Sequence, residues 1–210
     1  MVEYGIQKGR NQPVKFIAGL LLGLILVPLG AYMYFTGGSA PIATTDSDMP
    51  FETFLAHKAL NARIAKDMPK IVPIQATEAN YLAGAELYKQ DCGVCHGLPL
   101  SPKTAIANGM YPRPPQLFQE KGVTDDEPGE TYWKIFNGIR LTGMPGFSKS
   151  LSETQMWQVA ILLANADKLP ASAKAALVAS IAASTATTTA PVVSPVPPAP
   201  AFPNSVPPPK

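Results

Sequence analysis

The feature that most constrains this chain is one pentapeptide, Cys92-Gly93-Val94-Cys95-His96, which holds both of its cysteines and one of its two histidines. A disulfide framework would need more cysteines at wider spacing. A structural zinc site would need two further Cys or His ligands, and only His57 remains to supply one. The pentapeptide therefore predicts a chemistry that uses two thiols and the adjacent imidazole together.

The C-x-x-C-H spacing is typical of covalent haem attachment. Two thiols at this spacing can each form a thioether with one of the two vinyl groups of a haem, and the next imidazole can reach the iron. We therefore expect one haem c, held by Cys92 and Cys95, with His96 as an axial iron ligand. A thioredoxin-like redox pair is the alternative, but such a pair normally follows a strand, and no alternating strand pattern precedes the motif.

Iron bound by His96 needs a second axial ligand, and Met144 is the residue that we predict. It lies in the loop Leu141-Thr142-Gly143-Met144-Pro145-Gly146-Phe147, where the glycines allow close approach to a macrocycle and the proline limits backbone freedom. A loop methionine can also simply fill a gap in the core. His57 would instead give bis-histidine ligation, but it precedes the expected domain.

The other methionines are weaker candidates for this ligand. Met110 follows the motif too soon to cross easily to the opposite face of a haem, and Met156 falls inside an expected helix. The remaining four are Met68 and residues before it, all upstream of the motif. Met144 is therefore the favoured methionine.

An uncharged apolar stretch from Phe16 to Phe35 predicts a transmembrane helix. About twenty helical residues, at roughly 1.5 Å each, match a hydrocarbon core roughly 30 Å thick. The flanking charges place the N-terminus in the cytoplasm by the positive-inside rule, since basic residues precede the stretch and acidic ones follow it: Lys8, Arg10 and Lys15, then Asp46, Asp48 and Glu52. A cleaved secretory signal usually has an apolar region of only about 7–15 residues, so we favour an uncleaved anchor.

The rest of the chain predicts an all-α domain between two accessory segments, because helical spacing recurs and no strand pattern of useful length appears. We expect helices from Glu78 into the motif, from Glu130 to Ile139, and from Ser152 to Ala166. The expected parts are a cytoplasmic N-terminus (1–15), an anchor (16–35), a linker with a short amphipathic helix (36–77), the haem domain (78–170) and a low-complexity tail (171–210).

Both accessory segments allow two interpretations. Asp48 can cap the linker helix, which we expect to lie on the domain or the membrane surface; docking to a partner subunit is the alternative. The tail from Ala190 to Lys210 is rich in proline and poor in aromatic residues, so we expect a disordered spacer. A partner that recognises polyproline helices is the alternative.

The order Gly84-x-x-Leu87-Tyr88-x-x-x-Cys92-x-x-Cys95-His96-Gly97, a proline loop, Gly143-Met144-Pro145 and a closing helix with Trp157 resembles class I (mitochondrial-type) c-type cytochromes, in the bacterial membrane-anchored mono-haem group. The resemblance covers about Glu78 to Leu169. It implies that the first and last helices of the domain cross, with Gly84 and Tyr88 against Trp157 and its neighbours.

The resemblance also implies contacts around the haem. A carbonyl of the proline loop, from Pro112 or Pro114, would accept a hydrogen bond from the His96 ring. The haem propionates would contact Arg113, Tyr132 and Trp133. Ordinary surface packing would explain the presence of each of these residues nearly as well.

His/Met ligation predicts an electron carrier and not an enzyme, because a thioether raises the reduction potential and both axial positions are filled. The formal net charge of +2 is too small to suggest a nucleic-acid partner.

Expected partners are membrane redox complexes: a quinol-oxidising donor, and an oxidase or reaction centre as acceptor. The haem domain would lie in the periplasm, on a single-pass anchor in the bacterial inner membrane. The acidic residues 125–127 could steer such contacts, although a solvated loop explains them better.

Two other functions share these features. A fixed haem subunit of a respiratory or photosynthetic complex would use the same domain. A five-coordinate haem sensor or peroxidase would require Met144 to leave the iron unligated.

Overall fold

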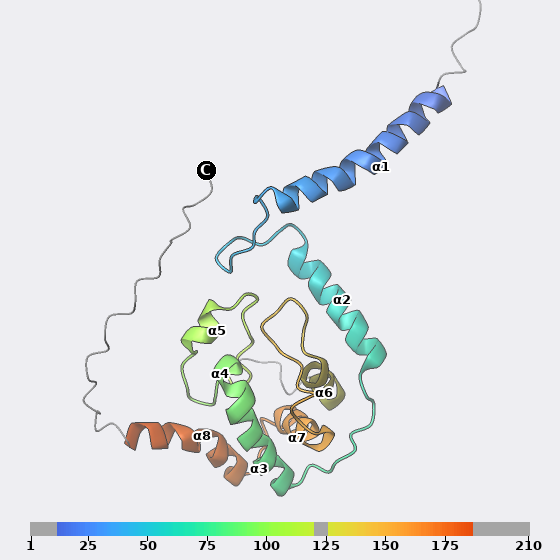
Figure 1. Cartoon of the computed structure of the whole chain (residues 1–210). Helices are drawn as coiled ribbons and strands as arrows, with labels where there is room; N and C mark the ends of the chain where they lie inside the picture. Colours follow the sequence, from blue (N-terminus) through green and yellow to red (C-terminus); the bar gives the residue numbers. More distant parts are fainter. Residues whose placement is uncertain (1–11, 120–125, 187–210) are drawn as a thin grey trace, which may run out of the picture. The chain divides into compact units, whose positions relative to one another are not determined.

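A computed structural model of the chain describes residues 12–119 and 126–186, and these ranges are helical with no strand. This confirms the all-α prediction. The elements in chain order (Figure 1) are α1 (Gln12–Thr36), α2 (Glu52–Asp67), α3 (Glu78–Leu87), the π-helical turn η1 (Tyr88–Cys92), α4 (Gly93–His96), α5 (Ala105–Gly109), α6 (Pro128–Asn137), α7 (Glu153–Ala164) and α8 (Ala171–Ala186). Lys8, Arg10, Asp125 and the proline-rich tail from Ala190 lie outside the described residues.

The chain divides into two compact units, one up to Ala59 and one from Leu60 onward. In the first unit, α1 contains a stretch from Pro13 to Thr36 that is long and apolar enough to cross a membrane, and none of it is buried by the rest of the chain. It extends slightly beyond the predicted span at both ends. A helix whose large apolar side chains remain exposed is suited to a lipid environment.

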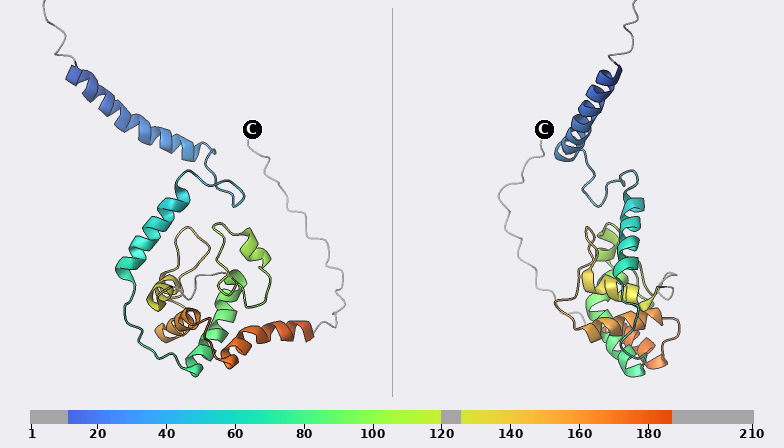
Figure 2. Two further views of the ribbon diagram at one scale, coloured as in Figure 1. Left: turned by 180° about the vertical axis from the view of Figure 1, so that it is seen from behind. Right: turned by 90° about the vertical axis from the view of Figure 1, so that its right-hand side faces the viewer.

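The second unit is built on the crossing of α3 and α7, as the resemblance implies (Figure 2). The backbone of α3 can approach α7 closely because Gly84 has no side chain: a Cβ atom there would lie 2.4 Å from the carbonyl oxygen of Gln158. Trp157 stacks on Tyr132 of α6, with ring centroids 4.3 Å apart. The core is thus a bundle of α3, α6 and α7, and η1 and α4 continue from the end of α3.

Helix α8 also belongs to this core. Ala173 and Leu177 are buried in the main hydrophobic cluster, and α8 packs against α3. The sequence placed the end of the haem domain at residue 170, whereas the packing continues to Leu177. Its alanine-rich composition resembles a low-complexity tail, but small residues four apart also form a helix face that fits closely against a neighbour.

Candidate haem site

The pentapeptide lies at the end of an almost continuous helical segment formed by α3, η1 and α4. Within it the backbone N–H of Gly93 donates to the carbonyl of Tyr88, a bond across five residues that widens the turn at Cys92. The thiols of Cys92 and Cys95 are free and half-buried. Gly97 ends the segment at φ 75°. Both thiols and the imidazole of His96 are therefore presented by one short helical stretch.

Two buried side chains fix the backbone of the motif. The hydroxyl of Tyr88 donates to the carbonyl oxygens of Gly97, at 2.8 Å, and His96, at 3.2 Å. Gln116, 1% exposed, donates through Nε2 to the carbonyl oxygen of Cys95 at 2.9 Å. Sequence reasoning missed Gln116, because a single glutamine after a proline loop carries no pattern that marks it as buried.

The ring of His96 is oriented by a carbonyl of the proline loop, but the expected residue was wrong. His96 Nδ1 lies 2.9 Å from the carbonyl oxygen of Pro115, not of Pro112 or Pro114. The backbone N–H of Leu117 donates to the carbonyl of His96 at 3.0 Å. Together with the bond from Gln116, it sets the register that brings Pro115 to the imidazole.

This hydrogen bond decides which ring nitrogen is available. With Nδ1–H donating to Pro115, the lone pair lies on Nε2, the arrangement found for metal-ligating histidines. Burial lowers the pKa of His96 below its ordinary value, while the hydrogen bond to Pro115 opposes that change. The neutral imidazole, which is the metal-binding form, is therefore favoured at neutral pH.

The thiol of Cys92 does not resemble a redox-active thiolate. Burial raises its pKa to about 12, with smaller contributions from Asp91 and Cys95 in the same direction. Reactive cysteines of the thioredoxin type have lowered pKa values and act as thiolates. Since the described residues also contain no strand before the motif, the thioredoxin-like alternative has no support.

Met144 lies in a loop, residues 138–147, that is held by its own backbone. The N–H of Met144 donates to Thr142 Oγ1 at 3.1 Å, and its carbonyl accepts from the N–H of Ile139 at 3.1 Å. Gly138, at φ 67°, lies so close to the returning chain that a Cβ atom there would come within 2.5 Å of the backbone nitrogen of Gly146. The loop therefore presents a half-buried Met144 from a fixed backbone.

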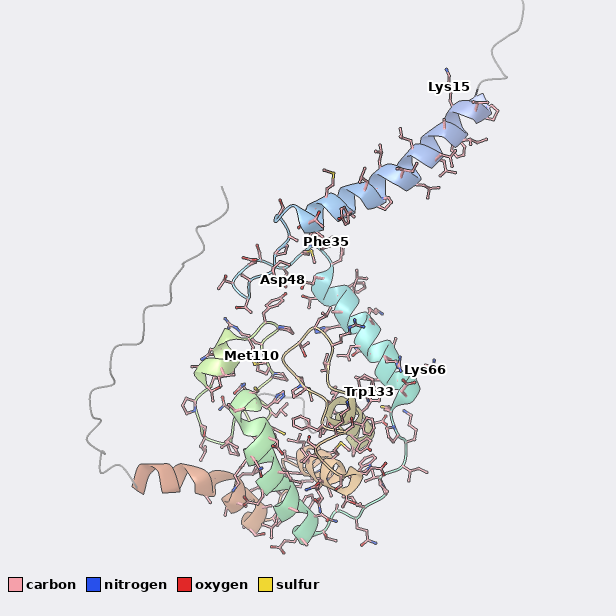
Figure 3. The ribbon with its side chains drawn as sticks, in the orientation of Figure 1. Lys15, Phe35, Asp48, Lys66, Met110 and Trp133 are labelled. Atoms are coloured by element: carbon pink, nitrogen blue, oxygen red, sulfur yellow. The ribbon has the colours of Figure 1, made fainter. Side chains whose placement is uncertain are left out.

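Met110 also lies at this loop, which sequence reasoning did not anticipate. A Cβ atom on Gly143 would lie 2.0 Å from Met110 Cε, so the methionine methyl packs directly on the residue before Met144. The chain returns this quickly because Thr104, at the start of α5, donates from Oγ1 to the carbonyl of Val94 at 2.6 Å. Figure 3 shows Met110 just after α5. Closeness in sequence to the motif does not keep Met110 away from the Met144 loop.

The remaining candidates lie in different environments. Tyr132 is 9% exposed and stacks on Trp157 in the core, whereas Trp133 is half-buried (Figure 3) and Arg113 is exposed. Their contacts with haem propionates stay predictions. Met156 is buried in the core at 1% exposure, and His57 is exposed on α2.

A family of known proteins matches the part of the chain that carries this geometry. Residues 79–163 match the family described as "Cytochrome C oxidase, cbb3-type, subunit III". The chain contains a cytochrome c domain. No curated protein matches the chain significantly.

Among solved structures, one is similar to part of this chain. It is the "Kuenenia stuttgartiensis reducing HAO-like protein complex Kustc0457/Kustc0458", with 26% sequence identity over 43% of this chain and a TM-score of 0.38. The match covers 45% of that structure's chain, less than half its length.

The residues of the cytochrome domain fit a covalently attached haem. Two free thiols, an imidazole with Nε2 available and a thioether on a fixed loop are the donors that haem c requires. Among the described residues, no group of three or more His, Cys, Asp or Glu side chains could hold a metal ion alone.

Proposed function

We propose that this chain is a membrane-tethered, mono-haem c-type cytochrome that carries single electrons between membrane redox complexes on the periplasmic side. The observation that carries the proposal is the orientation of His96, whose Nδ1 hydrogen bond to Pro115 leaves Nε2 available beside two free thiols. Cys92 and Cys95 would attach the haem, which supplies an iron that cycles between ferric and ferrous states.

Met144 completes the proposed coordination. Its loop is fixed by internal hydrogen bonds, so the thioether can be presented at one position in both redox states. An iron with His96 and Met144 on its two sides has no position open for oxygen or peroxide. This supports outer-sphere electron transfer and makes a sensor or peroxidase the weaker proposal.

The proposed tether is α1, which is long and apolar enough to span a membrane. A domain joined to such an anchor stays at high effective concentration near membrane-bound partners. A quinol-oxidising complex as donor and a terminal oxidase or reaction centre as acceptor would suit a carrier confined in this way.

A fixed subunit of one complex is the second candidate. The matched family is described as a subunit of an oxidase, and this favours permanent association over shuttling. The two proposals share the haem chemistry but differ in how long a partner stays bound. A shuttle would instead make only small, transient contacts with each partner.

The haem chemistry is tested by denaturing the membrane-purified protein and extracting it with acid–acetone. Haem should remain with the polypeptide, because carbon–sulfur bonds hold it, whereas a b-type haem protein treated in parallel releases its cofactor. The ferrous protein should not bind carbon monoxide before denaturation. Free haem in the extract would refute covalent attachment, and carbon monoxide binding by the native protein would favour the five-coordinate alternative.

Purification in a gentle detergent separates shuttle from subunit. A shuttle should leave the column mainly alone and should reduce an added oxidase at a rate that falls as ionic strength rises. A fixed subunit should elute with its complex in constant proportion through two successive columns.

A further inference from the structure

The first compact unit exposes apolar side chains just beyond α1. Ile42 is 84% exposed, Phe51 75%, Phe54 59% and Leu55 60%. We call these residues the juxtamembrane patch. Phe54 and Leu55 lie in the first turn of α2, and Lys58 follows at the spacing that places it on the same side of the helix. Exposed aromatic and aliphatic side chains in a group of this kind mark an interaction site.

The chain between α1 and α2 is folded into hydrogen-bonded turns that keep the patch near the end of the span. Asp46 Oδ2 accepts from the backbone N–H groups of Ile42 and Ala43, each at 2.8 Å. Asp48 Oδ2 accepts from Thr53 Oγ1 at 3.1 Å, and Glu52 Oε2 accepts from the N–H of Met49 at 2.8 Å. Figure 3 labels Phe35, in the last turn of α1, and Asp48, within this linker.

The acidic and basic side chains of this segment lie at different places relative to the patch. All three carboxylates of the segment, those of Asp46, Asp48 and Glu52, are engaged in internal hydrogen bonds. Lys58 is exposed, and its ammonium group can extend from the patch to lipid phosphates while its stem covers apolar surface. The carboxylates keep their charge, but those of Asp46 and Asp48 lie in the linker before α2, whereas Lys58 lies on the side of α2 that carries Phe54.

Phe51 adds an independent observation. It has φ 66°, a region that a bulky residue rarely adopts, yet its ring is 75% exposed and is not packed within the chain. A strained backbone that presents an aromatic ring to the outside points to a contact beyond the chain itself.

We propose that the juxtamembrane patch inserts into the headgroup region of the same bilayer that α1 crosses. This inference rests on the proposed membrane anchor and goes further, because it assigns the start of α2 to the lipid surface. The bilayer is the favoured occupant because the short, hydrogen-bonded linker joins the patch directly to the end of the proposed span. An amphipathic segment with aromatic and aliphatic side chains and a neighbouring lysine is suited to the boundary between headgroups and acyl chains.

The test uses the full haem-loaded chain in nanodiscs that contain a phospholipid with a photoreactive diazirine near the start of one acyl chain. After illumination, lipid adducts are located by mass spectrometry of peptides. We expect adducts in 16–36 and in 42–58, and none in α7. In the triple variant Phe51→Ser, Phe54→Ser, Leu55→Ser, the yield of adducts in 42–58 should fall about tenfold, while the yield in α1 should not change.

A matched control removes an exposed apolar side chain elsewhere. Ile71, 81% exposed, lies in the second unit, and Ile71→Ser should leave the adducts in 42–58 unchanged. Adducts in α1 but none in 42–58 would overturn the inference and leave the anchor standing. Adducts in neither segment would overturn the anchor as well. If 42–58 carries no lipid adducts and an added bifunctional amine-reactive crosslinker joins two copies through Lys58, the patch belongs to a contact with a second copy of the chain.

Discussion

The two segments that carry the proposed iron ligands are stabilised in different ways. The motif segment, residues 88–97, is fixed by two buried side chains: Tyr88, at its start, donates to the carbonyls of His96 and Gly97, and Gln116, 21 residues after Cys95, donates to the carbonyl of Cys95. The Met144 loop, residues 138–147, is fixed mainly by backbone groups: the N–H of Ile139 donates to the carbonyl of Met144 within the loop, and the N–H of Phe147 donates to the carbonyl of Ile135 in α6. Leu141, in this loop, is 92% exposed.

This difference predicts unequal responses to change. The motif segment shares its anchors with the helix core, so a substitution there alters folding and haem attachment together. The Met144 loop is bonded to α6 only at its ends, where the N–H groups of Gly138 and Phe147 donate to the carbonyls of Lys134 and Ile135, so a substitution at Met144 itself should alter ligation while the helices remain folded. The histidine side of the iron is thus expected to be the permanent ligand, and the methionine side the one that can be displaced.

The largest effect is expected from removing a thiol. Cys92→Ala or Cys95→Ala leaves one thioether at most, and the haem that organises the small core is then poorly attached. We expect holoprotein yield to fall by about an order of magnitude or more. Haem-stained gels and the pyridine haemochrome spectrum measure it. Val94→Ala changes an exposed residue inside the same pentapeptide without removing a thiol, and should mature normally; a normal yield of both cysteine variants would disprove attachment at this site.

The next effect concerns the iron ligand on the loop. Met144→Ala should abolish the weak near-infrared band of sulfur-to-iron ligation, lower the reduction potential and open the iron to carbon monoxide, because the thioether that favours ferrous iron is lost. Far-ultraviolet circular dichroism should remain unchanged, since the helices do not depend on this side chain. A native spectrum in Met144→Ala, together with a changed one in His57→Ala, would establish bis-histidine ligation instead.

Met110 makes a second variant necessary. Its methyl group packs on Gly143, so its sulfur lies beside the loop and is a candidate substitute when Met144 is removed. Met110→Ala alone should keep the near-infrared band. If Met144→Ala retains part of the band, the double variant Met110→Ala, Met144→Ala distinguishes substitution by Met110 from ligation by another residue.

A smaller effect is expected from the glycine that closes the loop. In Gly138→Ala the new Cβ meets the backbone of Gly146, Pro145 and Met144 at 2.5 to 2.8 Å, and φ 67° disfavours alanine. The free energy of unfolding should fall by about 2–3 kcal/mol, measured by guanidinium titration, and the near-infrared band should weaken. Gly109→Ala is the control, because nothing lies within 4 Å of its Cβ position. Equal stability of the two variants would show that the loop adjusts freely.

The sequence predicted those parts of the molecule that depend on local pattern. The apolar run of α1, the helices after Glu78 and the glycines around Met144 each leave a signal in consecutive residues. The register that gives Pro115 its role does not, since it follows from bonds made by Gln116 and Leu117 to a segment about twenty residues away.

Two other features depended on tertiary packing. The return of Met110 to the Met144 loop follows from the anchoring of Thr104 on Val94. The burial of Ala173 and Leu177 follows from the surface that α3 offers to α8. The composition of α8 does not show that α3 offers it a surface, and the residues around Met110 do not show that Thr104 bonds to Val94. The alanine-rich stretch was therefore interpreted as part of the tail.

The smallest effect is expected from removing a single hydroxyl group in the motif segment. Tyr88→Phe removes the hydroxyl that donates to the carbonyls of Gly97 and His96, and leaves those acceptors without this partner in a largely buried place. The free energy of unfolding should fall by about 1–2 kcal/mol, while the ring keeps its edge contact with Phe118. Tyr81→Phe removes a hydroxyl from α3, the helix before η1, where the half-buried ring packs against the core, and should change stability by less than about 0.5 kcal/mol. Because the thioethers and Met144 are untouched, the near-infrared band should persist in both variants. Loss of the band in Tyr88→Phe would mean that the two segments are coupled through the haem, and that the methionine side depends on the anchors of the histidine side.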